Sequence, residues 1–165
     1  MNTNLLPRLL RHLPAALGTL LLATAGQATA QCTTISPNAY WESFGTGCGT
    51  PPVLTASAAP VLGTTIGLIT SAQPATTAFT VTVLSLARSV PITGNPGGLP
   101  PGCLAFIGGG PGNFDVPVAG TTVSALAIPN VPALTGLVVY SQSAALLSVA
   151  PWAELANAVC LHIGT

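Results

Sequence analysis

The sequence predicts a single all-β domain, an antiparallel β-sandwich or jelly roll that is stapled by disulfides and preceded by a signal peptide. Gly and Pro interrupt the chain at short intervals, and the apolar runs between them are short and rich in β-branched side chains, which is typical of strands. Lys and Glu are almost absent, although exposed helix faces need such charges. Many short strands in a domain of this size are typical of sandwiches and jelly rolls.

Residues 1–30 have the features of a secretory signal peptide. Arginines precede an apolar run at 13–25 (LPAALGTLLLATA), which is too short to span a bilayer comfortably and so disfavours a membrane anchor. The small-residue motif that ends at Ala30 predicts cleavage after it. We expect a secreted protein, extracellular or on the cell surface, whose mature part, residues 31–165, forms the β-sandwich domain and keeps no membrane span.

The mature part is almost uncharged. Its charged residues are one cation, Arg88, and three acidic residues, Glu42, Asp115 and Glu154. Such a chain cannot form the basic surface that binds phosphate backbones, so the composition excludes nucleic acid as a partner. Its many aliphatic residues also argue against disorder. The partners that remain are a cell-surface protein, a glycan or a second copy of the chain.

Four cysteines, Cys32, Cys48, Cys103 and Cys160, follow the predicted cleavage site. An even number in an exported chain predicts disulfides, and four cysteines allow three pairings. No C-x-x-C pair is present, and the single mature histidine, His162, lies beside Cys160 in sequence, so the spacing does not fit a zinc site. We expect no metal ion and no cofactor.

The strongest strand pattern lies at 79–86 (FTVTVLSL). Strict alternation predicts that Phe79, Val81 and Val83 point inward and that the mostly polar set between them points outward. The remaining apolar runs predict strands at 53–56, 64–69, 103–107, 121–128, 136–142 and 158–163.

Helix signals are weak, and only 151–157 is expected to form a turn of helix. The stretches 91–101 (PITGNPGGLPP) and 108–113 (GGGPGN) predict turns. No phosphate-binding frame accompanies the glycines at 108–110, so they are interpreted as hairpin glycines with positive φ.

The ionisable side chains argue against an enzyme. A Ser-His-Asp triad would have to use His162 with Asp115 or a glutamate, and no G-x-S-x-G elbow carries a serine. Paired carboxylates could come only from the few acidic residues, so we predict no catalytic residues. Alternation places His162 on the face of Cys160 and Ala158, as a structural histidine. Arg88 and Asp115 are expected to face solvent or to form salt bridges.

The neighbouring rings of Tyr40 and Trp41, with Phe44 close by, are the candidate ligand platform. Flat aromatic surfaces of this kind stack on sugar rings in uncharged carbohydrate-binding modules. The alternative is packing within the core near Cys48, which we favour because one aromatic cluster alone is a weak signal of binding.

Four short segments, at 44–49 (FGTGCG), 60–63 (PVLG), 101–104 (PGCL) and 128–142 (IPNVPALTGLVVYSQ), form an ordered series along the mature chain. They match an aromatic-G-x-G-C opening, a P-x-x-G strand entry, a G-C-x-L segment and an I-P-N-x-P-x-L-x-G stretch that ends in Y-x-Q. Together they resemble an uncharacterised family of secreted β-domains that is abundant in planctomycetes.

The resemblance implies a compact extracellular β-domain with no established activity. It also implies a bridge between Cys48 and Cys103, which occupy the cysteine positions of the family. Cys32 and Cys160 depart from that pattern, and we expect them to pair with each other and tie the chain ends together. The expected function is that of a secreted or cell-envelope structural or interaction module, with a carbohydrate-binding module as the alternative.

Overall fold

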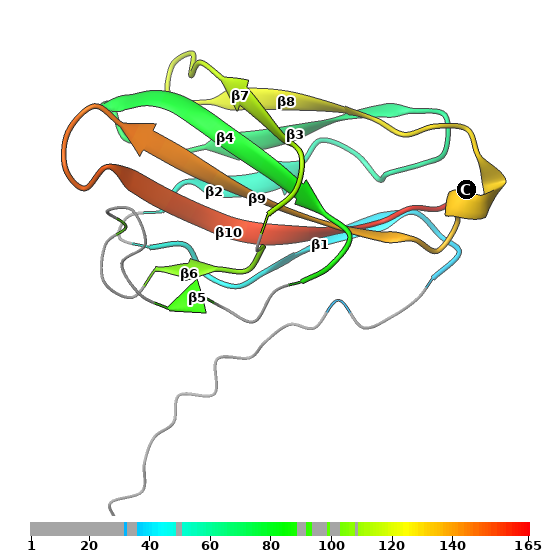
Figure 1. Cartoon of the computed structure of the whole chain (residues 1–165). Helices are drawn as coiled ribbons and strands as arrows, with labels where there is room; N and C mark the ends of the chain where they lie inside the picture. The colour runs from blue at the N-terminus through cyan, green and yellow to red at the C-terminus, as the bar shows by residue number, and fades with distance from the viewer. Residues whose placement is uncertain are drawn as a thin grey trace, which may run out of the picture.

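The computed structural model is an antiparallel β-sandwich, which confirms the predicted fold class (Figure 1). A five-stranded sheet packs on a three-stranded sheet, and a two-stranded ribbon lies beside them. The structure describes Cys32, Leu99 and the ranges 36–48, 51–88, 92–93 (backbone only), 103–107 and 109–165. The predicted signal peptide and its cleavage site lie outside these residues. Within the described ranges, no helix is long and apolar enough to cross a membrane.

The large sheet has the strand order β1-β10-β9-β4-β7 and the small sheet the order β2-β3-β8, with neighbouring strands antiparallel. The ribbon is formed by β5 and β6. The elements are β1 (Tyr40–Phe44), β2 (Val53–Ala56), β3 (Thr65–Ser71), β4 (Thr77–Ser85), β5 (Ile92–Thr93), β6 (Leu104–Ala105), β7 (Gly112–Asp115), β8 (Thr122–Ala127), the 3₁₀ turn η1 (Pro132–Leu134), β9 (Val138–Leu147) and β10 (Ala153–His162).

Every predicted strand overlaps an observed one, although β9 and β10 are longer than expected. The helical turn predicted at 151–157 is wrong, because most of that stretch is the first half of β10. There Ala153 and Leu155 are buried and alternate with Glu154, which is a strand pattern of period two.

The glycine-rich stretch at 108–113 ends in a strand that the sequence did not predict. β7 begins at Gly112 and pairs with β4, so tertiary pairing overrides the poor strand preference of glycine. Gly109 and Gly110 have positive φ, as expected. A side chain at Gly110 would also collide with the Leu84 carbonyl oxygen, so the chain passes β4 closely at this point.

Apolar side chains fill the sandwich toward the end that holds the C-terminus (Figure 1). Leu54 of β2 and Leu68 of β3 come from the small sheet, and Val159 and Leu161 of β10 come from the large one. These side chains are almost completely buried, and burial of each such aliphatic group contributes about 1.5–3 kcal/mol.

The other half of the inter-sheet layer is polar, and it corrects the face assignment predicted for β4. Thr80 and Thr82 point inward and are buried. Phe79, Val81 and Val83 point to the outer face of the sheet instead, and none of them is buried. The predicted orientation is therefore wrong for the whole strand.

Hydrogen bonds between hydroxyl groups explain why the threonines can lie inside. Ser143 Oγ on β9 accepts a hydrogen bond from Thr70 Oγ1 of the opposite sheet at 2.8 Å and lies 2.9 Å from Thr82 Oγ1. A polar group that finds a partner inside the protein avoids most of the cost of leaving water. Alternation of polarity alone could not reveal these partners.

Gln73, in the turn between β3 and β4, extends the same network. Its Nε2 donates to the Thr70 carbonyl oxygen and to Thr122 Oγ1, both at 2.9 Å. Its Oε1 accepts a hydrogen bond from Thr80 Oγ1 at 2.7 Å. These contacts join β3, β8 and β4, so one amide side chain fastens both sheets at this end.

We expect Ser143→Ala to lower the free energy of unfolding by about 1–3 kcal/mol, because the hydroxyls of Thr70 and Thr82 lose their shared partner. Urea denaturation measures the change. Ser148→Ala is the matched control, since its exposed hydroxyl bonds only to the Thr76 carbonyl oxygen and its removal should cost less than about 0.5 kcal/mol. Equal losses in the two variants would contradict the role of the buried network.

Residues 103–107 cover part of the outer face of the large sheet and are called here the outer layer. Phe106 packs edge to face against Phe44 of β1, with ring centroids 5.4 Å apart. Gln142 of β9 holds the segment, because its Oε1 accepts from the Phe106 N–H at 2.9 Å and its Nε2 donates to the Leu104 carbonyl oxygen at 3.1 Å. The outer layer leaves β10 buried on both of its faces.

Two disulfides fasten this side of the molecule and confirm the expected pairing. Cys48–Cys103 joins the outer layer to the loop after β1, with Cα atoms 4.7 Å apart. Cys32–Cys160 ties the start of the domain to β10, with Cα atoms 6.2 Å apart. Both bridges close long loops, which is where a cross-link restricts the unfolded chain most.

Replacing Cys48 and Cys103 together by Ser should lower the free energy of unfolding by about 2–5 kcal/mol, because the bridge joins positions 55 residues apart. The variant keeps Cys32–Cys160, so one bridge is tested at a time. Thermal unfolding followed by circular dichroism measures the effect. A melting temperature equal to that of the wild type would show that the bridge is not formed or contributes nothing.

Candidate functional site

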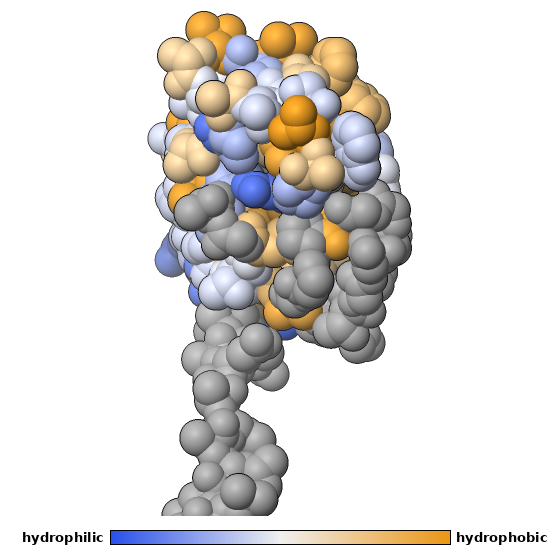
Figure 2. Space-filling model, turned by 90° about the vertical axis from the view of Figure 1, so that its left-hand side faces the viewer, coloured by the Kyte–Doolittle hydropathy of each residue, from blue (hydrophilic) through white to orange (hydrophobic). Residues whose placement is uncertain are grey.

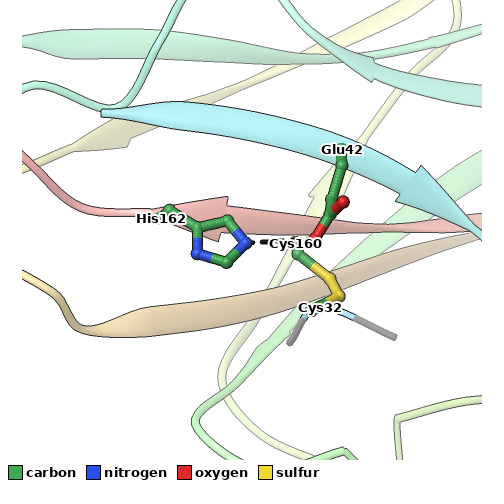
Figure 3. A network of polar contacts seen from close by, with 4 residues as sticks. All are labelled: Cys32, Glu42, Cys160 and His162. Atoms are coloured by element: carbon green, nitrogen blue, oxygen red, sulfur yellow. Dashed lines mark hydrogen bonds and ion pairs between the residues drawn. A yellow bond between two sulfur atoms is a disulfide. The ribbon is translucent and has the colours of Figure 1, made fainter. Parts of the chain in front are cut away.

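The densest group of ionisable side chains lies on the outer face of β1 and β10, where Glu42 faces His162 (Figure 3). His162 Nε2 lies 3.2 Å from Glu42 Oε1. The Tyr40 ring stacks on the imidazole, with centroids 4.0 Å apart. His162 is 1% exposed and Glu42 is half-buried, so the pair lies at the edge of the protein interior.

The pairing register of β1 with β10 builds this group. Tyr40 lies opposite His162, and Glu42 lies opposite Cys160. Directly paired residues of antiparallel strands point to the same face, so the ring lies beside the imidazole and the carboxylate lies diagonal to it. His162 shares this face with Cys160 and Ala158, as the alternation predicted.

The surroundings of His162 limit the chemistry of the pair. A carboxylate that holds one imidazole nitrogen is the orienting half of a nucleophilic triad, in which the other nitrogen faces a hydroxyl or thiol. His162 Nδ1 is buried and has no hydrogen-bond partner among the described residues. We assign the proton to Nε2, which donates to Glu42, because this tautomer avoids a buried N–H without an acceptor.

Cys32, Glu42 and Cys160 bring three atoms that could ligate a metal within 4.8 Å of one another. Metal ions such as zinc bind cysteine as a thiolate. The sulfur atoms of Cys32 and Cys160 are joined in a disulfide, as Figure 3 shows, so this group has only the Glu42 carboxylate to offer in the oxidised protein.

Arg88 and Asp115 contact neutral groups, and neither forms a salt bridge with another described residue. The Arg88 guanidinium lies over the rings of Phe44 and Phe106, at 5.0 and 5.9 Å from their centroids. The Asp115 carboxylate, at the end of β7, accepts a hydrogen bond from Ser124 Oγ of β8. Both side chains are half-buried. The cation–π contacts add to the packing of the outer layer on the sheet.

Glu154, on β10 beside the β9–β10 turn, titrates abnormally. Burial raises the pKa of its carboxyl above the ordinary value. Its Oε2 is buried and has no hydrogen-bond partner within the part of the chain that the structure describes. Loss of hydration without a compensating donor disfavours the charged form.

We expect Glu154→Gln to stabilise the domain at neutral pH by no more than about 1 kcal/mol, because it removes a partly desolvated charge. Since the pKa of Glu154 is higher in the folded than in the unfolded state, this carboxyl favours folding at low pH. That contribution is lost as the pH rises through the unfolded-state pKa to the folded-state pKa.

Urea denaturation of the wild type and Glu154→Gln at about pH 4 and about pH 7 measures this effect. The difference in unfolding free energy between the two proteins should be small at the lower pH and larger at the higher one. A difference that does not change with pH would assign the stabilisation to packing and not to charge.

Tyr40 and Trp41 do not form a joint platform. As successive residues of β1, they point to opposite faces of the sheet. Trp41 packs against the apolar core between the sheets, whereas Tyr40 stacks on His162 on the outer face. The two rings therefore share no surface on which one sugar could stack.

Exposed aromatic rings lie at positions that the sequence did not single out. Phe79 of β4 is 50% exposed, Phe114 of β7 is 72% exposed, and Trp152 before β10 is 57% exposed. The pattern assigned Phe79 to the interior, and Trp152 lay in the stretch predicted as a helical turn. The chain matches no known family model, no curated protein and no solved structure. Its function must be inferred from its own surface and charges.

Proposed function

We propose that this chain is a secreted or cell-envelope structural or interaction module and not an enzyme. The observation that carries the proposal is an apolar surface on the outer face of the large sheet, beyond the outer layer. This apolar face comprises Phe79 and Val81 of β4, Phe114 of β7 and Leu146 of β9, and it borders Ala144 of β9, which packs against the outer layer. Contiguous apolar surface on a soluble domain marks sites of interaction with other macromolecules.

The strand register makes these side chains neighbours. Val81 is paired with Phe114 on one side and with Ala144 on the other, and Phe79 is paired with Leu146. Cross-strand partners point to the same face, with Cβ atoms about 5 Å apart. Two rings and their aliphatic neighbours thus form one continuous patch across three strands.

β7 also forms one edge of the large sheet. Soluble proteins usually protect such edges with lysine, proline or inward-pointing charge. β7 carries such an inward-pointing charge, because Asp115 lies opposite the buried Thr80 and its carboxylate accepts a hydrogen bond from Ser124 of the other sheet. Phe114 is left as the most exposed large side chain of this strand. The exposed ring of Phe114, on the outer side of this strand, therefore favours contact through the apolar face and not through pairing at the edge.

The charges of the protein do not favour a partner of either sign. After residue 30 the charged side chains are Glu42, Arg88, Asp115 and Glu154, all within the described residues, and each is half-buried. A surface with so few charges produces little long-range attraction or repulsion. The partners that fit are neutral: a cell-surface protein, wall material or a second copy.

Export supports the same proposal. Disulfides persist in oxidising compartments, and the two bridges here hold the outer layer and the chain start. The predicted signal peptide and the family resemblance point in the same direction. The glycan-binding alternative would need a ring other than the pair Tyr40 and Trp41, and Trp152 is the exposed tryptophan.

We expect the double substitution Phe79→Ser and Phe114→Ser to move the protein from the cell surface into the medium. Burial of each Phe contributes about 1.5–3 kcal/mol to association, so loss of both should raise the released fraction at least about tenfold. Immunoblots of the surface and medium fractions of producing cells measure the distribution, and thermal melts check that the variant is folded.

Val123→Ser is the matched control, because Val123 is also exposed but lies on the outer face of β8, on the small sheet. It should leave the distribution unchanged. A wild-type protein that is released entirely into the medium and also sediments as a monomer would argue against the proposed function.

A further inference from the structure

The apolar core opens to the surface at the C-terminal end of the sandwich. A cleft of about 140 Å³ lies there between the end of β8, η1 and the start of β9. Leu126, Leu134, Leu137 and Val139 line it and are half-buried, and Ile163 closes its floor. Half-buried leucines around one opening leave space for an apolar group from outside.

The opposite end of the sandwich carries an exposed aromatic ring. Trp152 lies in the turn between β9 and β10 and is 57% exposed, and Val149 in the same turn is 50% exposed. Figure 1 shows this turn at the left and η1 at the right. β9 runs from the cleft to the turn over 10 residues, so the two features are roughly 30 Å apart.

Figure 2 faces the end of the sandwich that holds this turn. Hydrophobic groups (orange) are visible at several places on it, separated by pale and blue atoms. Anything that binds to this end would therefore use individual projecting side chains more than a broad apolar surface.

We propose that Trp152 of one copy inserts into the apolar cleft of a second copy, so that the domain assembles head to tail. An apolar cavity of about 150 Å³ holds one benzene ring, so a cleft of this size fits the six-membered ring of an indole. The indole N–H would stay at the mouth, where water reaches it, as is usual for buried Trp side chains. The inference rests on the proposed role in interaction and names a second copy as one partner.

A second copy is the occupant that the charges favour. None of the described residues that line the cleft is charged, and the charged residue nearest Trp152 in sequence, Glu154, points one carboxylate oxygen into the protein. Two copies can therefore approach end to end without like-charge repulsion. Because the Trp152 ring and the cleft lie at opposite ends of the sandwich, the contact is heterologous and generates open chains rather than closed dimers.

Sedimentation velocity of the mature protein over a concentration series tests the proposal. The wild type should show a sedimentation coefficient that keeps rising with concentration. Trp152→Ala should weaken association at least tenfold, and Leu134→Glu, which places a charge at the cleft, should do the same from the other side. Val123→Ala is the matched control, since it shortens an exposed apolar side chain of β8 that belongs to neither end nor to the apolar face, and it should not change association.

A mixture of the two end variants decides the geometry. The Trp152→Ala variant still has an intact cleft, and the Leu134→Glu variant still has the Trp152 ring. A mixture of the two should therefore form a one-to-one dimer and nothing longer. A wild type that stays monomeric, a closed wild-type dimer, or a mixture that stays monomeric while the wild type assembles would each overturn the inference.

If Leu134→Glu does not fold, Leu134→Ala with a thermal melt replaces it. None of these outcomes affects the distribution of the Phe79→Ser and Phe114→Ser variant between cell surface and medium. Head-to-tail assembly and the proposed function can therefore be disproved independently.

Discussion

β10 is buried on both of its faces, and both sheets and the outer layer are packed around it. Its inward side chains, Val159 and Leu161, complete the core between the sheets. Its outward side chains, Ala158 and Cys160, lie under Phe44 and the outer layer. A strand covered on both faces needs neighbours on both sides for its backbone hydrogen bonds, and β1 and β9 supply them. The disulfides and Gln142 keep the cover in place.

The outer layer also divides the outer face of the large sheet into a covered region and an open one. Near β1 and β10 the ionisable side chains already have partners, because Arg88 packs on aromatic rings and Glu42 contacts His162. Beyond the outer layer the face is apolar, and the rings of Phe79 on β4 and Phe114 on β7 are exposed there. The few charged side chains of the described residues therefore take part in internal contacts, and the open region is neutral.

The interior is also divided along the sandwich. At the end near the β9–β10 turn, hydroxyl and amide groups satisfy one another around Ser143 and Gln73. At the C-terminal end the contacts are apolar and open into the cleft beside Leu134. A hydrogen-bonded end specifies the relative position of the two sheets, because each buried polar group must meet its own partner. Apolar contacts tolerate small changes in geometry better than hydrogen bonds do, which is compatible with a cleft at this end that a ring from another molecule can enter.

The fold class could be predicted from the amino-acid pattern alone, because strand-length apolar runs, frequent Gly and Pro, and the lack of surface charges for helices are local properties. The pattern also indicated that His162 and Cys160 share one face, since alternation along one strand is local as well. The inward orientation of Thr82 was decided only by tertiary structure, because its partners lie on other strands.

Tertiary structure also separated Tyr40 from Trp41, because a burial preference in sequence does not say which of two faces a ring covers. The exposed positions of Phe114 and Trp152 likewise depend on which part of each surface another segment covers. The alternation of residues along a strand shows which side chains share a face. Hydrogen-bond partners, and the segments that cover a face, are contacts between parts of the chain that are far apart in sequence. Those contacts exist only once the sheets have packed.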